Sequence, residues 1–434
     1  MPDPFLTLPA SPQLLLRRAR VPRCFLDAPA NAPELVSCDI RIAEGCIAEV
    51  GPGLPASGPA ADLAGGIVFP GFVDMHTHID KGHIWPRASN ADGTHGAALA
   101  AVKADREANW SAADVAARAG FSLRCAYAHG TVALRTHLDS LGDQLDISWP
   151  VFKALRAEWA GRITLQAVAL VPLAAYGTPF CERLADVVAE AGGLLGGSGA
   201  LEPDAAALIR RVFDLAVDRN LDIDLHVDET GDPAAQTLRL IAQEAIRRRY
   251  AGRVTCGHCC SLAVQDPAEA RETVALVAEA GLTVVSLPMV NLYLQGRRAP
   301  ETPTWRGVTL LHELRAAGVR VAVASDNTRD PFYGFGDLDM AEVFREAVRI
   351  GHLDMPVGDW PAAAASSPAA AMGVPGGRVR AGAAADFVLF SARSYSELLS
   401  RPQSDRIVLR AGRVIDATVP SYRELDQLLP GMEG

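Results

Sequence analysis

The sequence predicts an α/β protein: a (β/α)8 barrel of the TIM type with a small composite β-sandwich domain built from both chain ends. Three observations support this prediction. Between residues 66 and 327, β-rich apolar runs alternate with Ala/Leu/Arg/Glu-rich segments of helical period. These runs number eight and recur about every 30 residues, as barrel strands do. The length of 434 residues accommodates a barrel of about 250 residues and a smaller domain. A doubly wound open sheet is the alternative.

The small domain is expected to take residues 1–66 and 378–434. Segment 38–53, CDIRIAEGCIAEVGPG, alternates apolar and polar positions and ends in Gly-Pro-Gly, which predicts short strands and a turn. Near the other end, ADFVLFSA and RIVLRAGRVID are also β-rich. We expect the two ends to pair into one small sheet, which leaves residues 67–377 for the barrel.

The predicted barrel strands follow one another along the chain as short apolar segments. They are GIVFPGFVDMH, TVALRTHLD, ITLQAVAL, GLLGGSG, DIDLHVDE, RVTCGHC, LTVVSLPMV and VRVAVASDN. The fourth is the weakest, because glycines replace the β-branched residues that favour strands. In a barrel, the carboxyl ends of all eight strands meet at one mouth.

Composition excludes several classes of protein. Apolar residues make up 49% and charged residues 21%, which is typical of a globular chain. The net charge of −10, without a basic run, disfavours nucleic-acid binding. No apolar stretch approaches the roughly 20 residues that span a bilayer, and the first residues lack a secretory leader, so we expect a cytoplasmic protein.

The motif CGHCC brings Cys256, Cys259 and Cys260 close together in the sequence. A zinc knuckle would need a second Cys/His pair at finger-like spacing, and none follows. A buried or lining role for the three thiols is favoured.

Histidines and acids gather at the ends of the predicted strands. His76 and His78 end the first strand and point to the same side, because strand side chains alternate. His226, with Glu229 three residues on, ends the fifth strand. His258 ends the sixth and Asp326 the eighth. Each signal alone is weak, but their convergence at one mouth predicts a metal site.

Three other histidines leave alternatives open. His83 and His95 lie in the loop after the first strand, where contact with substrate and ordinary solvation are both possible, with solvation favoured. His137 ends the second strand and is as suited to a pocket as to packing.

The segments PGFVDMHTHID, LHVDET, TCGHCC and ASDN, in this order, resemble the amidohydrolase superfamily. The resemblance covers most of residues 65–420 and extends to the terminal β segments. HVDE, SLPMVNLYLQGR and SDNTRDPFYGFG are similar to the cytosine deaminase branch. HTHIDK and SDN also resemble triazine-processing members.

The resemblance implies a set of metal ligands: His76, His78, His226 and Asp326. Their borderline character suits zinc or iron. A second metal in this superfamily usually needs a carboxylated lysine near the end of the fourth strand. ITLQAVAL and GLLGGSG contain none, so one divalent cation per chain is expected.

The same resemblance implies the catalytic roles. A bound cation lowers the pKa of water towards about 7. Asp326 and His258 are expected to accept and relay its proton, and Glu229 to protonate the ring nitrogen beside the reacting carbon. The alternative for Glu229 is a carboxylate that orients His226.

Four residues are candidates for substrate binding: Gln295, Phe332, Asn327 and Lys81. Gln295 is placed to read a polar ring, although a surface glutamine is the alternative. Phe332 is suited to stacking on a ring or to core packing. Lys81 is read as a pocket or salt-bridge residue.

Two departures from cytosine deaminases concern these contacts. ALVPLAAYG lacks the glutamine that they carry after the third strand, and Asn327 replaces their second aspartate. A substrate whose polar groups lack hydrogen-bond partners in the site is strongly disfavoured, so these two departures put cytosine itself in doubt as the substrate.

We therefore predict a metal-dependent hydrolytic deaminase that releases ammonia from cytosine or a closely related amino-substituted nitrogen heterocycle. One alternative is an amidohydrolase that acts on an N-substituted amino-triazine or a cyclic amide. A catalytically inactive barrel scaffold is disfavoured because every ligand and proton-transfer position is filled. The expected partner is a small heterocyclic substrate, and a homo-oligomer stays open.

Overall fold

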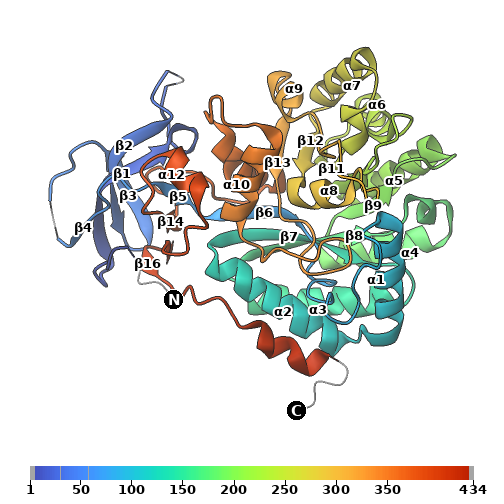
Figure 1. The fold of residues 1–434 in the computed structure, drawn as a ribbon, viewed down its shortest axis with the longest axis horizontal. Coiled ribbons are helices and arrows are strands. Elements are labelled where there is room, and N and C mark those ends of the chain that lie inside the picture. The colour runs from blue at the N-terminus through green and yellow to red at the C-terminus, as the bar shows by residue number, and fades with distance from the viewer. Residues whose placement is uncertain (1–4, 30, 57, 430–434) are drawn as a thin grey trace. The chain divides into compact units, whose positions relative to one another are not determined.

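The computed structural model describes residues 5–29, 31–56 and 58–429 of the chain (Figure 1). They divide into two units. One lies within residues 1–74, 124–133 and 339–420, and the other within residues 75–123, 134–338 and 421–434. Because several segments contribute to each unit, the chain passes between the units more than once.

The strands of the first unit form two four-stranded sheets. The first sheet has the order β3-β2-β1-β4 and is made of β1 (Gln13–Pro22), β2 (Leu35–Ala43), β3 (Cys46–Gly51) and β4 (Ala60–Asp62). The second has the order β16-β15-β14-β5 and is made of β5 (Val68–Pro70), β14 (Phe387–Leu389), β15 (Ile407–Arg410) and β16 (Arg413–Val414).

The expected single sheet of both chain ends is therefore wrong. The C-terminal strand β14 pairs antiparallel with β5, while β1 is already flanked by β2 and β4. An isolated bridge, Cys46–Ala384, links the two groups of strands. Phe69 packs against the rings of Phe25, Phe72, Phe344 and Phe390, so aromatic side chains form a core of this unit.

Strands form at all eight segments predicted for the barrel, and they lie in two sheets. The sheet of order β6-β7-β8 contains β6 (Phe72–Thr77), β7 (Thr131–Asp139) and β8 (Thr164–Leu170). The sheet of order β13-β12-β11-β10-β9 contains β9 (Leu195–Gly199), β10 (Ile223–Val227), β11 (Val254–His258), β12 (Thr283–Ser286) and β13 (Arg320–Val323).

Parallel pairing runs through the larger sheet and continues into the smaller one. Every neighbouring pair from β9 to β13 is parallel. Parallel bridges Val168–Leu194 and Pro172–Ser198 join β8 to the β9 region, and Thr77–Asp326 joins β6 to the chain after β13. The parallel α/β architecture predicted from the sequence is confirmed.

Helices connect these strands, as parallel pairing requires. The α-helices are α1 (His95–Asn109), α2 (Ala112–Ala128), α3 (Gln144–Glu158), α4 (Phe180–Ala191), α5 (Ala205–Arg219), α6 (Thr237–Arg248), α7 (Pro267–Glu279), α8 (Pro288–Leu294), α9 (Leu311–Ala316), α10 (Met340–Gly351), α11 (Ser366–Met372) and α12 (Tyr395–Ser400). Short 3-10 turns occur at Arg23–Phe25, Leu173–Gly177, Cys260–Ala263, Trp360–Ala364 and Tyr422–Leu428.

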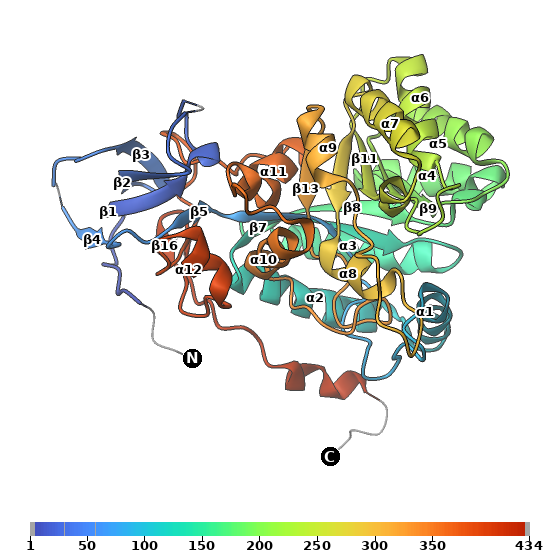
Figure 2. The ribbon, with the colours of Figure 1, turned by 45° about the horizontal axis from the view of Figure 1, so that its top comes forward.

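Local sequence explains where these helices begin and which face they bury. The carboxylate of Asp266 accepts a hydrogen bond from the Ala268 N–H, and Pro267 occupies the first turn of α7. In α5, Ile209, Val212 and Phe213 are buried at helical spacing. Helices α5, α6 and α7 pack one beside the next (Figure 2). Among the described residues, no helix is both long and apolar enough to cross a membrane.

Close packing explains the glycines of β9. A Cβ atom on Gly196 would lie 2.4 Å from Val168 Cγ1 and 2.5 Å from the carbonyl oxygen of Asp224. A Cβ atom on Gly193, just before the strand, would lie 2.5 Å from the Trp149 ring. These glycines weakened the strand prediction, yet a larger residue at either position would clash with the neighbouring backbone or side chains.

We expect Gly196→Ala to destabilise the protein by about 1–3 kcal/mol or more, since overpacking forces neighbouring groups to move. The control is Gly120→Ala in α2, where a Cβ atom meets nothing within 4 Å. That change should be neutral or slightly stabilising, because alanine favours helices. Urea unfolding of both variants measures the difference, and equal midpoints would contradict the packing argument.

Candidate active site

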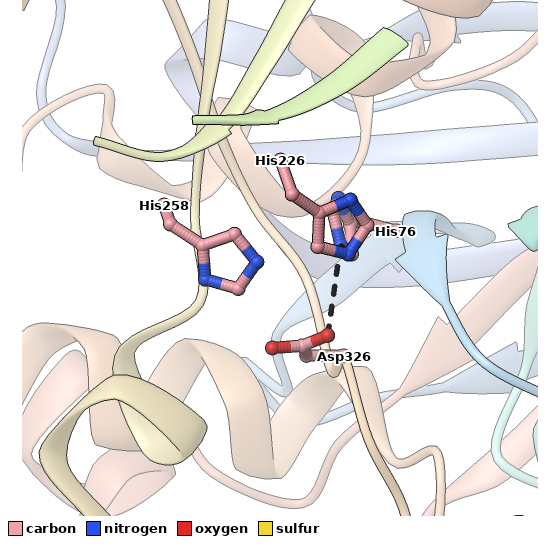
Figure 3. A group of neighbouring side chains, drawn as sticks. All are labelled: His76, His226, His258 and Asp326. Atoms are coloured by element: carbon pink, nitrogen blue, oxygen red, sulfur yellow. Dashed lines mark hydrogen bonds and ion pairs between the residues drawn. The ribbon is translucent and has the colours of Figure 1, made fainter. Parts of the chain in front are cut away.

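Four buried side chains from four strand ends gather in the second unit (Figure 3). His76 lies on β6, His226 on β10 and His258 at the end of β11, while Asp326 follows β13. Their ligand atoms all lie within 4.8 Å of one another. His78, just after β6, joins them, so the residues predicted at separate strand ends converge.

The closest approaches in this cluster involve the Nε2 atoms. His226 Nε2 lies 3.1 Å from Nε2 of His76 and 3.1 Å from Nε2 of His78. Asp326 Oδ1 lies 3.1 Å from His78 Nε2 and 3.5 Å from His76 Nε2. Three ring nitrogens and one carboxylate oxygen therefore lie around a common point.

Burial keeps the three imidazoles neutral. It is the main cause that holds the pKa values of His76, His78 and His226 well below the ordinary value, and neighbouring cationic groups lower them further. A neutral imidazole offers its lone pair to a metal, whereas a protonated one cannot. Ligands about 2.0–2.1 Å from zinc in a tetrahedron lie roughly 3.3 Å apart, so both the donor types and their spacing fit a divalent cation.

A second group with metal-ligand atoms lies beside the first and consists of His76, His137 and Asp224. Arg135 Nη1 lies 2.7 Å from Asp224 Oδ2, so a guanidinium already faces this carboxylate. The His137 ring packs 4.0 Å from that of His76, centre to centre, and is fully buried. Of the two alternatives for His137, a pocket residue or a packing residue, the structure therefore favours packing against His76.

Glu229 lies beside the cluster and shares a partner with His258. Asn291 directs its Nδ2 atom to both residues, 3.3 Å from Glu229 Oε1 and 3.0 Å from His258 Nδ1. The carboxylate oxygen itself lies 3.4 Å from His258 Nδ1. Burial alone would raise the pKa of Glu229, but His258 and His95 lower it overall. The carboxylate is therefore held close to the histidine cluster by two neighbours.

These residues open onto a cavity of about 470 Å³. His78, His226, Glu229 and His258 contribute to its polar part. Its lining also includes the apolar side chains Leu99, Val102, Leu141, Leu170, Val171 and Pro172. Charged side chains, among them Lys103, Arg106, Asp139 and Glu202, also line it. A concave site that combines apolar walls with convergent polar groups is the usual form of a small-molecule site.

Lys81 lies in the cavity lining and also forms a salt bridge, so both of its expected roles apply. Its Nζ atom lies 2.7 Å from Asp139 Oδ1, and Arg106 Nη1 lies 2.8 Å from the other oxygen of the same carboxylate. Burial alone would raise the pKa of Asp139, but the two cations lower it overall. Asp139 therefore stays charged and fixes both basic side chains.

The other predicted substrate residues differ in position. Phe332 lines the cavity and lies 5.5 Å from Lys81 Nζ. Asn327 also lines it, while its amide donates to Asp330 Oδ2 over 2.7 Å. Gln295 is not among the lining residues: it is buried behind Glu229 and donates to the backbone oxygen of Glu229 over 3.1 Å.

The backbone at two of the strand ends takes an unusual conformation. His258 and Asp326 have φ values of 66° and 64°, in the left-handed region that costs a non-glycine residue about 1–3 kcal/mol. The Asp326 N–H donates to the carbonyl of His76 over 2.9 Å. This bond ties the two ligand-bearing segments together and stabilises the turn that directs the carboxylate inward.

Sequence reasoning assigned two histidines less well. His83 was expected to be solvated, but it is buried against Phe121. For His95, both solvation and contact with substrate were left open; its side chain is 43% exposed, and it also lines the cavity, with Nε2 3.6 Å from Glu229 Oε2. Both positions depend on how the loop after β6 folds back, which no local pattern specifies.

Other site residues were missed because they are distant in sequence. Asp139 pairs with Lys81 and Arg106 only in the folded chain, and Asn291 comes from α8. Gly257 carries no side chain, yet a Cβ atom there would lie 2.7 Å from His76 Cε1. The three thiols of CGHCC are buried and unbonded to one another, as favoured from the sequence.

The chain belongs to the amidohydrolase family, whose sequence pattern matches residues 60–164 and 175–416. This confirms the predicted superfamily, and the protein is a hydrolytic deaminase of that superfamily. It is 53% identical over 431 residues to a pterin deaminase of Rhizobium rhizogenes (strain K84), an alignment that covers 98% of this chain and 99% of the relative.

Two solved structures share the fold. 5-Methylcytosine deaminase from Klebsiella pneumoniae, liganded with 5-fluorocytosine, has a TM-score of 0.81 at 24% identity, with 92% of this chain and 97% of that chain covered. N-Isopropylammelide isopropylaminohydrolase from Burkholderia multivorans has a TM-score of 0.73 at 27% identity, with 93% and 98% covered. Both similarities span nearly the whole chain.

We expect Gly257→Ala to weaken metal binding by roughly 10–100-fold, because the added methyl group displaces the His76 ring from the cluster. Elemental analysis after dialysis against a graded series of chelator concentrations measures the loss, with Gly120→Ala as the control. Wild-type metal retention in Gly257→Ala would contradict this role for the glycine.

Proposed function

We propose that this protein is a pterin deaminase, which hydrolyses the 2-amino group of a pterin to an oxo group and releases ammonia. The observation that carries the proposal is 53% identity to a pterin deaminase along practically the entire chain. A pterin is a fused two-ring heterocycle, so the cavity must accommodate both rings.

The shape and lining of the cavity support a fused ring over a single pyrimidine. Beside Glu229 and His258, the lining includes apolar side chains from α1 and from the ends of β7 and β8, together with the charged residues Lys103, Arg106 and Asp139 of the same elements. Leu170, Val171 and Pro172 form an apolar wall at the place where cytosine deaminases were expected to offer a glutamine. We propose that the second ring packs against this wall and that Phe332 contacts the ring face.

We further propose that the eight strands form the closed (β/α)8 barrel, with the site at its carboxyl mouth. His76, His78, His226 and Asp326 would hold one divalent cation, zinc or iron, as predicted from the sequence. When bound, such a cation makes a water molecule acidic enough to act as a nucleophile near neutral pH and polarises the reacting carbon's substituent.

The chain's own residues move the protons. In this proposal Glu229 protonates the ring nitrogen next to the reacting carbon, which prevents negative charge from accumulating on the ring. Asp326 and His258 take one proton of the attacking water and pass it to the amino group. The second proton of that water is lost as the carbonyl forms and leaves with the ammonia as ammonium. Asn291 holds Glu229 and His258 in position, because its amide nitrogen contacts both.

The second candidate is removal of an alkylamine from an N-substituted triazine. It is kept because the Burkholderia multivorans enzyme shares 27% identity and the fold with this chain. The two candidates differ in the leaving group: ammonia in one case and an alkylamine in the other.

A substrate panel tests the proposal. The metal-loaded protein is assayed with pterin, cytosine and N-isopropylammelide, and both ammonia and isopropylamine are measured. We expect the highest kcat/KM for ammonia release from pterin. Turnover confined to cytosine would restore the sequence prediction, and isopropylamine release alone would favour the second candidate.

We expect Glu229→Gln to lower kcat by about 10²–10⁴-fold while metal content stays at the wild-type level, because the amide cannot donate the proton. Steady-state kinetics with elemental analysis checks this. If Glu229 instead orients a metal ligand, metal binding should weaken and excess metal should restore much of the rate. Such rescue would refute the role as proton donor.

A further inference from the structure

His95 has a fixed place at the mouth of the cavity. It is the first residue of α1, whose start is set by Thr94, since the Thr94 side chain accepts a hydrogen bond from the Ala97 N–H. The His95 ring lies 5.4 Å from the Phe332 ring, centre to centre, in an edge-on arrangement. A helix cap and an aromatic neighbour thus hold the imidazole against the site.

The two oxygens of Glu229 face different surroundings. Oε1 faces inward, 3.3 Å from Asn291 Nδ2 and 3.4 Å from His258 Nδ1. Oε2 lies 3.6 Å from His95 Nε2. The carboxylate therefore lies between the buried reaction centre and the imidazole of His95.

Exposure increases along this series of side chains. The side chain of His258 is 2% exposed, that of Glu229 15% and that of His95 43%. Water thus reaches His95 far more readily than it reaches Glu229. A proton that arrives from solvent can pass through His95 to Glu229 without any opening of the buried end of the cavity.

The reaction needs such a proton. In the proposed reaction Glu229 gives its own proton to the ring nitrogen, while both protons of the attacking water leave with the amino nitrogen as ammonium. Glu229 must therefore regain one proton from solution in each turnover. After that transfer Glu229 is a carboxylate, and the imidazole beside its outward oxygen Oε2 is that of His95, 3.6 Å away. A neighbouring group that holds a proton near neutral pH is required to supply it.

His95 has the charge environment for this task. The charged groups that face it are the Glu229 carboxylate, from the loop after β10, and Lys81, from the loop after β6. Burial alone would lower the pKa of His95, and Lys81 also lowers it, but Glu229 raises it overall. His95 is therefore protonated to a higher pH than an ordinary histidine.

We propose that His95 is a proton relay that acts through Glu229: a proton passes from solvent to His95, from Nε2 of His95 to Oε2 of Glu229, and then to the substrate's ring nitrogen. His95 returns to its starting state by taking another proton from water. This proposal rests on the deaminase chemistry proposed above. A merely structural role for His95 would fix the orientation of Glu229 and move no proton.

The test compares His95→Gln and His95→Ala with the wild type, all metal-loaded, on the best substrate of the panel. Glutamine can still donate to Glu229 but cannot relay a proton. We expect both variants to lose at least about tenfold in kcat, with KM nearly unchanged. The wild-type kcat should fall as pH rises through the raised pKa of His95, and this alkaline limb should be absent in both variants.

Rescue of the rate by added imidazole distinguishes a proton relay from a purely structural role of His95, because free imidazole can carry a proton but cannot restore a packing contact. Added imidazole should restore kcat of His95→Ala, more strongly at low pH where the imidazolium form predominates. It should not restore Glu229→Gln, nor affect His312→Ala, in which an exposed histidine of α9 is removed.

Two results would overturn the relay: wild-type kcat in His95→Gln, or a reduced rate in His95→Ala that imidazole leaves unchanged at every pH. Failure of the wild-type protein to deaminate any panel substrate would refute the proposed function instead. The two failures are therefore distinguishable.

Discussion

The site depends on bringing several electron-pair donors to one point inside the protein. Nε2 atoms of His76, His78 and His226 and an oxygen of Asp326 lie 3.1–3.5 Å from their neighbours. Burial holds the pKa values of the imidazoles well below the ordinary value, so the rings are neutral and each can offer a nitrogen lone pair at this point. A divalent cation satisfies such a group of donors, and the surrounding structure serves to hold them in place.

Close backbone contact makes this convergence possible. Gly257 leaves room for the His76 ring, and Gly196 lets β9 approach β8 and β10. The Asp326 N–H bonds to the His76 carbonyl, which joins the first and last strands of the series at the level of the ligands. Positive φ values at His258 and Asp326 cost conformational energy, and that cost is offset by bonds that hold these turns.

Charge is arranged differently in two groups of residues at the cavity. In the first, Asp139 fixes Lys81 and Arg106 through two short ion pairs. In the second, Glu229 is surrounded by His95, His258 and Asn291. The first group is closed, because the carboxylate is matched by its two cations. In the second, Glu229 lies between the buried ring of His258 and the half-exposed ring of His95, which is the arrangement that the proposed proton relay uses.

The sequence by itself determined the parallel α/β architecture, the eight strands between residues 66 and 327 and the superfamily. It did so because strand runs have a local apolar pattern and because His76-Thr77-His78, His226, His258 and Asp326 all lie at strand ends, where position along the strand fixes position in the fold. The regular spacing of the strands also located the weak fourth strand. Its glycines are explained only by the close approach of neighbouring strands in the folded chain.

The tertiary structure decided everything that depends on contacts between distant segments. It separated the terminal strands into two sheets, since β14 pairs with β5, and it buried His83. It placed Gln295 behind Glu229 and brought His95 to the carboxylate. Side chains on loops and helices do not lie at strand ends, so their position in the sequence does not determine their position in the fold. Their positions follow from packing across the fold, and local periodicity carries no record of that packing.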